Sequence, residues 1–183
     1  MDSDKRKRRN MWRVVFVIYL IFLMYFLFFS DLFGRTVVYE DYRYNLEPFK
    51  EIKRFCTTVK DKDYLIFFVN IIGNIVLFMP FGYLFMAVTE GRQYRHKKIV
   101  TGFLDAFVAA FIFCLTVETA QLLSKVGVFD VDDVILNVFG AILGYFVYVI
   151  ARRVRTATRN REYERNEEKE RKQCSIQKKR VFR

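Results

Sequence analysis

The sequence predicts an all-α integral membrane protein, a four-helix bundle with both its N-terminus and its C-terminus in the cytoplasm (N-in and C-in). Three observations predict this fold class. The chain of 183 residues is 53% hydrophobic and 18% aromatic, yet it has a formal net charge of +11. Its charged residues gather at the ends and in the loops, and four long apolar runs lie between them. A soluble domain of this length rarely combines so much apolar content with such segregation of charge.

The four apolar runs cover residues 11–29, 64–88, 99–123 and 134–151. Each is close to the roughly 20 helical residues that cross the hydrocarbon core of a bilayer. Backbone groups in lipid must pair within the protein, and no run alternates with the period of two that a membrane β-strand requires. The first run is longer than the roughly 7 to 15 residues of a signal-peptide core. We therefore expect four transmembrane helices, of which the first is retained.

The distribution of lysine and arginine predicts the orientation. The first 13 residues contain six basic side chains, the loop "EGRQYRHKK" contains four, and the tail from Arg152 contains thirteen. By contrast, the segment from Ser124 to Asp133 has one lysine against three aspartates. Because basic segments stay on the cytoplasmic side, both termini are expected there. The predicted organisation is a basic cytoplasmic N-terminus (1–10), a first helix (11–29), an extracellular loop (30–63), a core of three helices (64–151) and a basic cytoplasmic tail (152–183).

Polar side chains of the last three helices should gather in the outer half of the membrane. At a rise of about 1.5 Å per residue, Glu118 lies roughly 30 Å from the cytoplasmic start of its helix. Asp132 and Asp133 stand at the outer start of the next helix. Residues three or four apart share a helix face, and a polar face in lipid is expected to turn inward. We therefore expect an outward-opening polar pocket built from three such pairs, Asn70 with Asn74, Glu118 with Gln121 and Asp133 with Asn137, with Asp132 at its rim.

Two other roles for these side chains need no ligand. Amides and carboxylates often form only interhelical hydrogen bonds, typically worth about 0.6 to 2 kcal/mol. Asp130 and Asp132 are also well placed to cap the following helix and to interact with the positive end of its dipole. Glu118 is the strongest functional candidate, because ionisable groups within membrane helices are functional by default. Gly140 and Gly144 form a small-xxx-small pair, which favours close helix packing.

Three motifs carry a resemblance to a known family. "NIIGNIVLFMPFG" at 70–82, "ETAQLL" at 118–123 and "FDVDDVILNVFGAILGY" at 129–145 are together similar to the VanZ-like family of bacterial membrane proteins, which is named for a teicoplanin-resistance protein. The resemblance covers roughly residues 64–150. Many members place an arginine shortly before the aspartate motif, where this chain has Lys125, which lacks the planar fork of arginine. The polar positions that match the family are Asn70, Asn74, Glu118, Gln121, Asp130, Asp132, Asp133 and Asn137, and the matching backbone positions are Gly73, Pro80, Gly82, Gly140 and Gly144.

The resemblance implies a multi-pass protein of the bacterial cell membrane that lowers susceptibility to teicoplanin-type lipoglycopeptides. Its polar pocket would bind an envelope lipid, a lipid-linked cell-wall intermediate or the antibiotic itself. The alternative is an intramembrane enzyme in which Glu118 and Asp133 act as acid and base on a lipid or cell-wall substrate. The pocket offers no serine, cysteine or histidine nucleophile, so whether any reaction is catalysed stays open. A transporter is a third alternative, although four helices leave little room for alternating access.

No metal, cofactor or nucleic acid is expected as a partner. The tail from Arg152 mixes both charges and is predicted to be a charged helix that contacts anionic lipid headgroups, each basic residue contributing about 1 kcal/mol. It lacks the folded basic scaffold that nucleic-acid binding requires. Cys56, Cys114 and Cys174 fall in three different compartments of the predicted topology, which excludes an intramolecular disulfide. His96 lies in a basic loop and has no partner in sequence.

Overall fold

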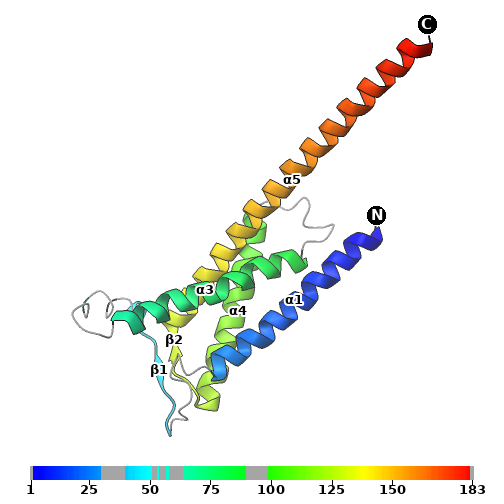
Figure 1. Cartoon of the computed structure of the whole chain (residues 1–183). Helices are drawn as coiled ribbons and strands as arrows, with labels where there is room; N and C mark the ends of the chain where they lie inside the picture. The colour runs from blue at the N-terminus through cyan, green and yellow to red at the C-terminus, as the bar shows by residue number, and fades with distance from the viewer. Residues whose placement is uncertain are drawn as a thin grey trace. The chain divides into compact units, whose positions relative to one another are not determined.

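The computed structural model describes residues 2–29, 40–50, 53, 57, 64–89 and 99–181. Within these residues, four helices are long and apolar enough to cross a membrane, which confirms the expected all-α fold with four candidate spans. The elements, in chain order, are α1 (Asp2–Phe29), β1 (Tyr44–Asn45), α3 (Tyr64–Thr89), α4 (Ile99–Ser124), β2 (Phe129–Asp130) and α5 (Val131–Val181) (Figure 1).

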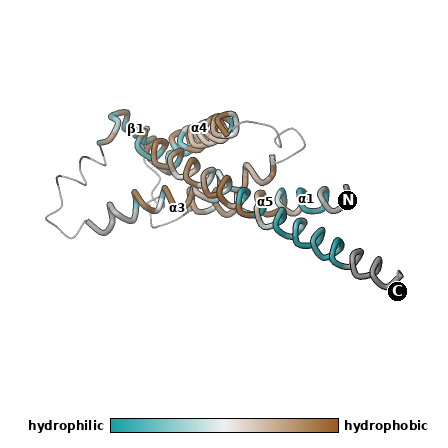
Figure 2. The backbone as a smooth tube through the Cα atoms, turned by 90° about the horizontal axis from the view of Figure 1, so that it is seen from above, coloured by the Kyte–Doolittle hydropathy of each residue, from teal (hydrophilic) through white to brown (hydrophobic). Residues whose placement is uncertain are grey.

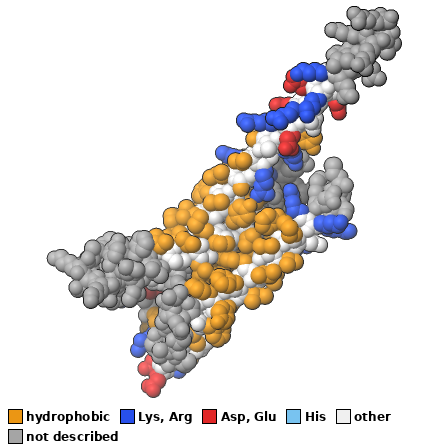
Figure 3. Space-filling model, in the orientation of Figure 1, with side chains coloured by type: hydrophobic (Ala, Val, Ile, Leu, Met, Phe, Trp, Pro, Cys, Tyr) orange, Lys and Arg blue, Asp and Glu red, His pale blue; other side chains and the backbone are white. Residues whose placement is uncertain are grey.

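Two helices extend beyond their apolar runs. α1 begins at Asp2, ahead of the apolar run, because its lysines and arginines are good helix formers. α5 continues to Val181 through the predicted charged helix, where exposed pairs such as Glu168 with Lys172 are four residues apart and support the helix. Figure 2 shows the change along α5 from hydrophobic to hydrophilic residues. In Figure 3, charged side chains, many of them lysine or arginine, lie along the described C-terminal part of α5, whereas hydrophobic side chains cover most of the described surface of the bundle that is visible.

The chain divides into two compact units, Met1–Tyr148 and Val149–Arg183. In the first unit, consecutive helices run in opposite directions. The Tyr19 hydroxyl of α1 donates to the carbonyl of Leu77 in α3 at 2.7 Å, and the Tyr145 hydroxyl of α5 donates to the carbonyl of Ile99 in α4 at 2.6 Å. The end of α1, the end of α4 and the start of α5 therefore lie together at one end, and Asn74 in the first half of α3 reaches the start of α5 there. We call this end the strand end, because β1 and β2 lie there (Figure 1).

One hydrophobic core joins the four helices of the first unit. All four supply buried side chains, and rings of Phe81 and Phe113 pack with their centroids 5.0 Å apart. Because these apolar residues recur every three to four positions, each helix turns a continuous apolar stripe toward the others. The buried members of the core are Leu23, Leu27, Phe78, Phe81, Ala110, Cys114, Val117, Val134, Val138 and Ala141.

Glycines allow α3 and α5 to pack backbone against backbone. A Cβ atom at Gly144 would overlap the carbonyl of Met79, and one at Gly140 would overlap the carbonyl of Ile75. The same applies from the other helix, since a Cβ atom at Gly82 would overlap the backbone of Ala141. The close approach expected for the small-xxx-small pair is therefore confirmed, and it brings the polar faces of α3 and α5 together.

A short parallel strand pair was not expected from the sequence. Tyr44 of β1 pairs with Phe129 of β2, and Asn45 pairs with Asp130. The amide of Phe129 also donates to the carbonyl of Arg43 at 3.0 Å. Each strand has only two residues, so no periodic pattern predicts it. The pair attaches the described segment 40–50, which follows α1, to the turn that precedes α5.

Candidate functional site

The strand end contains a group of polar side chains contributed by α3, α4 and α5. We call Asn74, Glu118, Gln121, Asp133 and Asn137 the polar cluster. Four of them are almost completely buried, with exposed fractions of 1% for Asn74, 2% for Glu118, 0% for Gln121 and 3% for Asn137. Burial of polar groups is unfavourable unless they are hydrogen-bonded, so the partners of each member define what the cluster can do.

The closest contact within the cluster joins α3 to α5. The amide nitrogen Nδ2 of Asn74 donates to Oδ1 of Asp133 at 2.7 Å. This bond has the length of a charge-assisted hydrogen bond, which is stronger than one between neutral groups. Asn70 lies one turn before Asn74 and is partly buried. The expected meeting of the polar faces of these two helices therefore takes place through Asn74 and Asp133.

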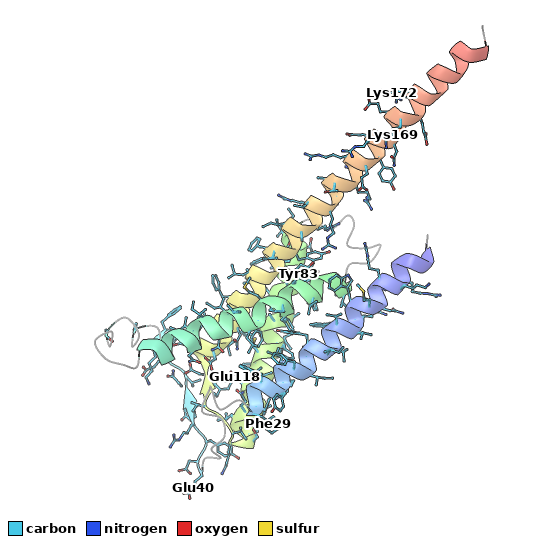
Figure 4. All side chains as sticks on the ribbon, in the orientation of Figure 1. Phe29, Glu40, Tyr83, Glu118, Lys169 and Lys172 are labelled. Carbon is cyan, nitrogen blue, oxygen red and sulfur yellow. The ribbon has the colours of Figure 1, made fainter. Side chains whose placement is uncertain are left out.

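Glu118 connects α4 to the turn before α5. Its Oε2 accepts a hydrogen bond from the amide of Asp130 at 3.2 Å, and Figure 4 shows the position of Glu118 in the bundle. Cys114 lies one turn earlier on the same face of α4 and is 1% exposed. Glu118 and the Cys114 thiol therefore share the inward face of α4.

Gln121 and Asn137 each hold a buried oxygen atom without a partner. The Nε2 of Gln121 donates to the carbonyl of Leu27 near the end of α1 at 2.8 Å, which fixes the orientation of the amide. Its Oε1 has no hydrogen-bond partner within the described part of the chain. The same is true there of Oδ1 of Asn137. Such atoms are rare in native proteins, and each calls for a specific explanation.

The aspartates at the start of α5 contact the protein itself. Oδ1 of Asp130 accepts the amide of Asp132 at 2.8 Å, which is the expected N-cap of α5. The Asp130 carboxylate also accepts from Nδ2 of Asn45, and both oxygens lie 3.2 Å from it. Asp132, which is 1% exposed, accepts the amide of Phe49. The capping interpretation is thus correct for Asp130, and the carboxylate of Asp132 holds the 40–50 segment, a contact that no local pattern signals.

Lys125, the one basic residue in the segment from Ser124 to Asp133, is directed to the 40–50 segment. It has a positive φ of 58° directly after α4. Its Nζ donates to the carbonyl of Glu40 and lies 5.1 Å from the centroid of the Tyr42 ring. The ammonium group therefore stabilises the 40–50 segment through a hydrogen bond and a cation–π contact.

Metal binding receives no support from the described residues, among which no three His, Cys, Asp or Glu side chains converge on one point. Cys56 and His96 lie outside the described residues, as does the side chain of Cys174. The chemistry available in the polar cluster is that of carboxylate and amide groups buried within the protein. Their oxygens accept hydrogen bonds and stabilise positive charge.

Substitution of Asp130 by alanine should lower the free energy of unfolding by about 1 to 2 kcal/mol, because it removes the N-cap of α5. It also removes the acceptor of Asn45, so the 40–50 segment should exchange its amide hydrogens faster. Thermal unfolding and hydrogen exchange of the purified chain would measure the two effects. Glu47→Ala is the control, since this carboxylate is 77% exposed in the same segment. Equal effects of the two substitutions would contradict the capping role.

Comparison with known proteins places these features in a family. The sequence profile described as VanZ/LLP1 matches residues 16–152. Protein VanZ of Enterococcus faecium is 35% identical over 81 residues, which are 44% of this chain and 45% of that protein. The matched region thus spans less than half the length of this curated relative, and no solved structure matches the chain. Because the family profile covers well over half of the sequence, including every member of the polar cluster, the chain belongs to the VanZ/LLP1 family.

Proposed function

We propose that this chain lowers the susceptibility of a bacterium to teicoplanin-type lipoglycopeptides by binding an envelope ligand in an outward-facing polar pocket formed by the polar cluster. The ligand is an envelope lipid, a lipid-linked cell-wall intermediate or the drug itself. Membership of the VanZ/LLP1 family and the identity with Protein VanZ support a role of this type. The four apolar helices support a multi-pass location in the bacterial cell membrane.

The orientation belongs to the same proposal. Consecutive helices run in opposite directions, so the start of α1 and the part of α5 around Tyr145 lie opposite the strand end. Six basic residues precede or begin the apolar run of α1, and thirteen follow that of α5. The excess of lysine and arginine favours the cytoplasm for both termini. The strand end, with the polar cluster, then faces the cell exterior, where lipoglycopeptides and cell-wall precursors meet.

One observation carries the proposal. Three different helices bury polar side chains at the same end of an otherwise apolar bundle, and two of those side chains retain unpartnered oxygens among the described residues. A bundle that needed only interhelical hydrogen bonds would satisfy both ends of each amide. Ionisable and polar groups at membrane depth are costly, and they typically mark binding sites or pathways.

The contacts favour binding over catalysis by Glu118 and Asp133. Each carboxylate accepts a hydrogen bond from the protein, Glu118 from the backbone and Asp133 from Asn74. These bonds tie both carboxylates to groups of the protein that hold the helices together, and neither bond joins a carboxylate to a nucleophile. An enzyme would instead be indicated by a modified lipid or glycan whose formation depends on Glu118.

The test is antibiotic susceptibility of a bacterial host that expresses the wild type, Glu118→Gln or Asp133→Asn at matched membrane levels. We expect the wild type to protect against teicoplanin and not against vancomycin. Loss of one charge-assisted hydrogen bond costs about 1.5 to 3 kcal/mol, so either variant should reduce ligand affinity about tenfold to a hundredfold. Most of the protection should then disappear.

Glu47→Gln supplies the matched control, because it removes a carboxylate charge from an exposed position outside the cluster. It should protect as well as the wild type. Full protection by Glu118→Gln and Asp133→Asn would limit the two carboxylates to a structural role, and lack of protection by the wild type would overturn the proposed function itself.

A further inference from the structure

Two of the three amide side chains of the polar cluster donate a hydrogen bond within the protein itself. The Nδ2 of Asn74 donates to Asp133, and the Nε2 of Gln121 donates to the carbonyl of Leu27. The amide of Asp130 donates to Glu118. The buried side-chain atoms of the cluster that have no partner among the described residues are both acceptor oxygens, so a ligand that uses them must supply the hydrogen-bond donors.

Two acceptors are unpartnered within the described residues. Oε1 of Gln121 belongs to a side chain that is 0% exposed, and Oδ1 of Asn137 belongs to one that is 3% exposed. Gln121 follows Glu118 by one turn on the same face of α4, and Asn137 follows Asp133 by one turn on the same face of α5. Each unpartnered oxygen thus stands on the inward face that also carries a carboxylate.

The ionisable side chains of the cluster, Glu118 and Asp133, are both acidic. The fully buried polar side chains among the described residues are two carboxylates, Glu118 of the cluster and Asp132 outside it, and the three amides of the cluster, and none is a lysine or an arginine. Asp133 adds a third, partly buried carboxylate. In an interior of low dielectric constant, this arrangement repels an anionic group such as a phosphate and attracts a cation.

The cation is better matched by an ammonium group than by a metal ion. No three carboxylate, histidine or cysteine side chains of the described residues converge as a metal would require. An ammonium group carries three N–H donors on one small charged atom. Such a group can hydrogen-bond to separate oxygens on neighbouring helices without a fixed coordination polyhedron.

We propose that the polar cluster binds a protonated primary amine, with Glu118 and Asp133 supplying the negative charge and Gln121 and Asn137 supplying neutral acceptor oxygens. This inference rests on the proposed function, because it names the chemical class that the pocket recognises. The amine belongs either to a lipid headgroup or to a water-soluble molecule, and the chemistry of recognition is the same for both. An ethanolamine headgroup is the simplest lipid example.

The test measures the midpoint of thermal unfolding, Tm, of the purified full chain in detergent without any antibiotic. Methylammonium chloride should raise Tm by about 3 °C or more at ten times its Kd. Tetramethylammonium chloride has the same charge and no N–H donor, so at equal ionic strength it should give no comparable shift. Sodium chloride should likewise have little effect. Equal stabilisation by methylammonium and by either control salt would overturn the proposal.

Variants locate the effect in the cluster. Glu118→Gln and Asn137→Leu should each abolish most of the shift caused by methylammonium, and Glu47→Gln should retain it. Two substitutions on different helices are used so that misfolding of one variant does not decide the result. A full shift in a folded Glu118→Gln or Asn137→Leu protein would overturn the assignment to these residues.

The source of the amine is identified with vesicles of defined composition. The chain is reconstituted in phosphatidylglycerol mixed with either phosphatidylethanolamine or phosphatidylcholine. A higher Tm with phosphatidylethanolamine that requires Glu118 supports a lipid headgroup, and a response to methylammonium alone supports a soluble amine. No response to either overturns the proposal.

Because no antibiotic is present in these measurements, the two proposals can fail separately. Amine binding without any resistance phenotype would overturn only the proposed function. Resistance without amine binding would overturn only the inference about the amine.

Discussion

Gly144→Val should prevent most of the protein molecules from folding. The first added carbon already overlaps the carbonyl of Met79, and it also approaches the amide of Tyr83. Neither neighbour is a flexible side chain that can move aside, so α3 and α5 must separate. Overpacking of a well-packed core typically costs about 1 to 3 kcal/mol, and a clash with backbone on this scale should reach or exceed the upper value. The yield of monodisperse protein and its Tm would measure the loss.

Val147→Leu is the control for that substitution. It adds a methylene group to the same helix at a position that is 44% exposed, where no neighbouring backbone resists it. We expect this variant to unfold at nearly the wild-type temperature. Similar Tm values for Gly144→Val and Val147→Leu would contradict the close packing of α3 and α5.

Asn74→Asp should have the second largest effect, because it replaces the donor of Asp133 by a second carboxylate. The Asn74 nitrogen lies 2.7 Å from Oδ1 of Asp133, so two negative charges would face each other in a largely buried site. An uncompensated buried charge costs about 3 to 5 kcal/mol, and we expect a loss of stability of this order at neutral pH. Acidification should restore part of it, since protonation of one carboxyl group turns the repulsion into a hydrogen bond.

The double variant Asn74→Asp, Asp133→Asn tests the same contact with donor and acceptor exchanged. It exchanges the carboxylate and the amide between α3 and α5 and should recover much of the lost stability at neutral pH. Chemical unfolding at two pH values would compare the variants. A stability of Asn74→Asp that does not change with pH, together with no recovery in the double variant, would show that residues 74 and 133 do not interact.

The four helices were predictable because their signal is local. The length of an apolar run and the positions of its charges are read from neighbouring residues, and they identify the four candidate spans. The inward turn of the polar faces of α3 and α5 was expected from a similar pattern, since polar residues at helical spacing must turn away from lipid, whereas the particular bond of Asn74 with Asp133 was not. The close packing at Gly140 and Gly144 was predictable for the same reason.

The remaining features depend on contacts between distant residues. Neither Asn45 nor Phe49 belongs to a periodic pattern, and their roles arise only once Asp130 and Asp132 lie beside them. The acceptor of Gln121 is a backbone carbonyl, that of Leu27, which no side-chain motif identifies. Backbone groups are the same at every residue, so a sequence carries little information about which of them a side chain will reach.

The strand pair also constrains the order in which parts of the protein fold during synthesis. Phe49 and Asp132 are 83 positions apart in sequence, and Asn45 and Asp130 are 85 apart. A ribosome that adds roughly 5 to 20 residues per second needs about 4 to 17 s to make that stretch. During this time the 40–50 segment has been synthesised, while its partners have not. Its attachment is therefore a late event, and a nascent chain arrested before Phe129 should leave this segment open to protease.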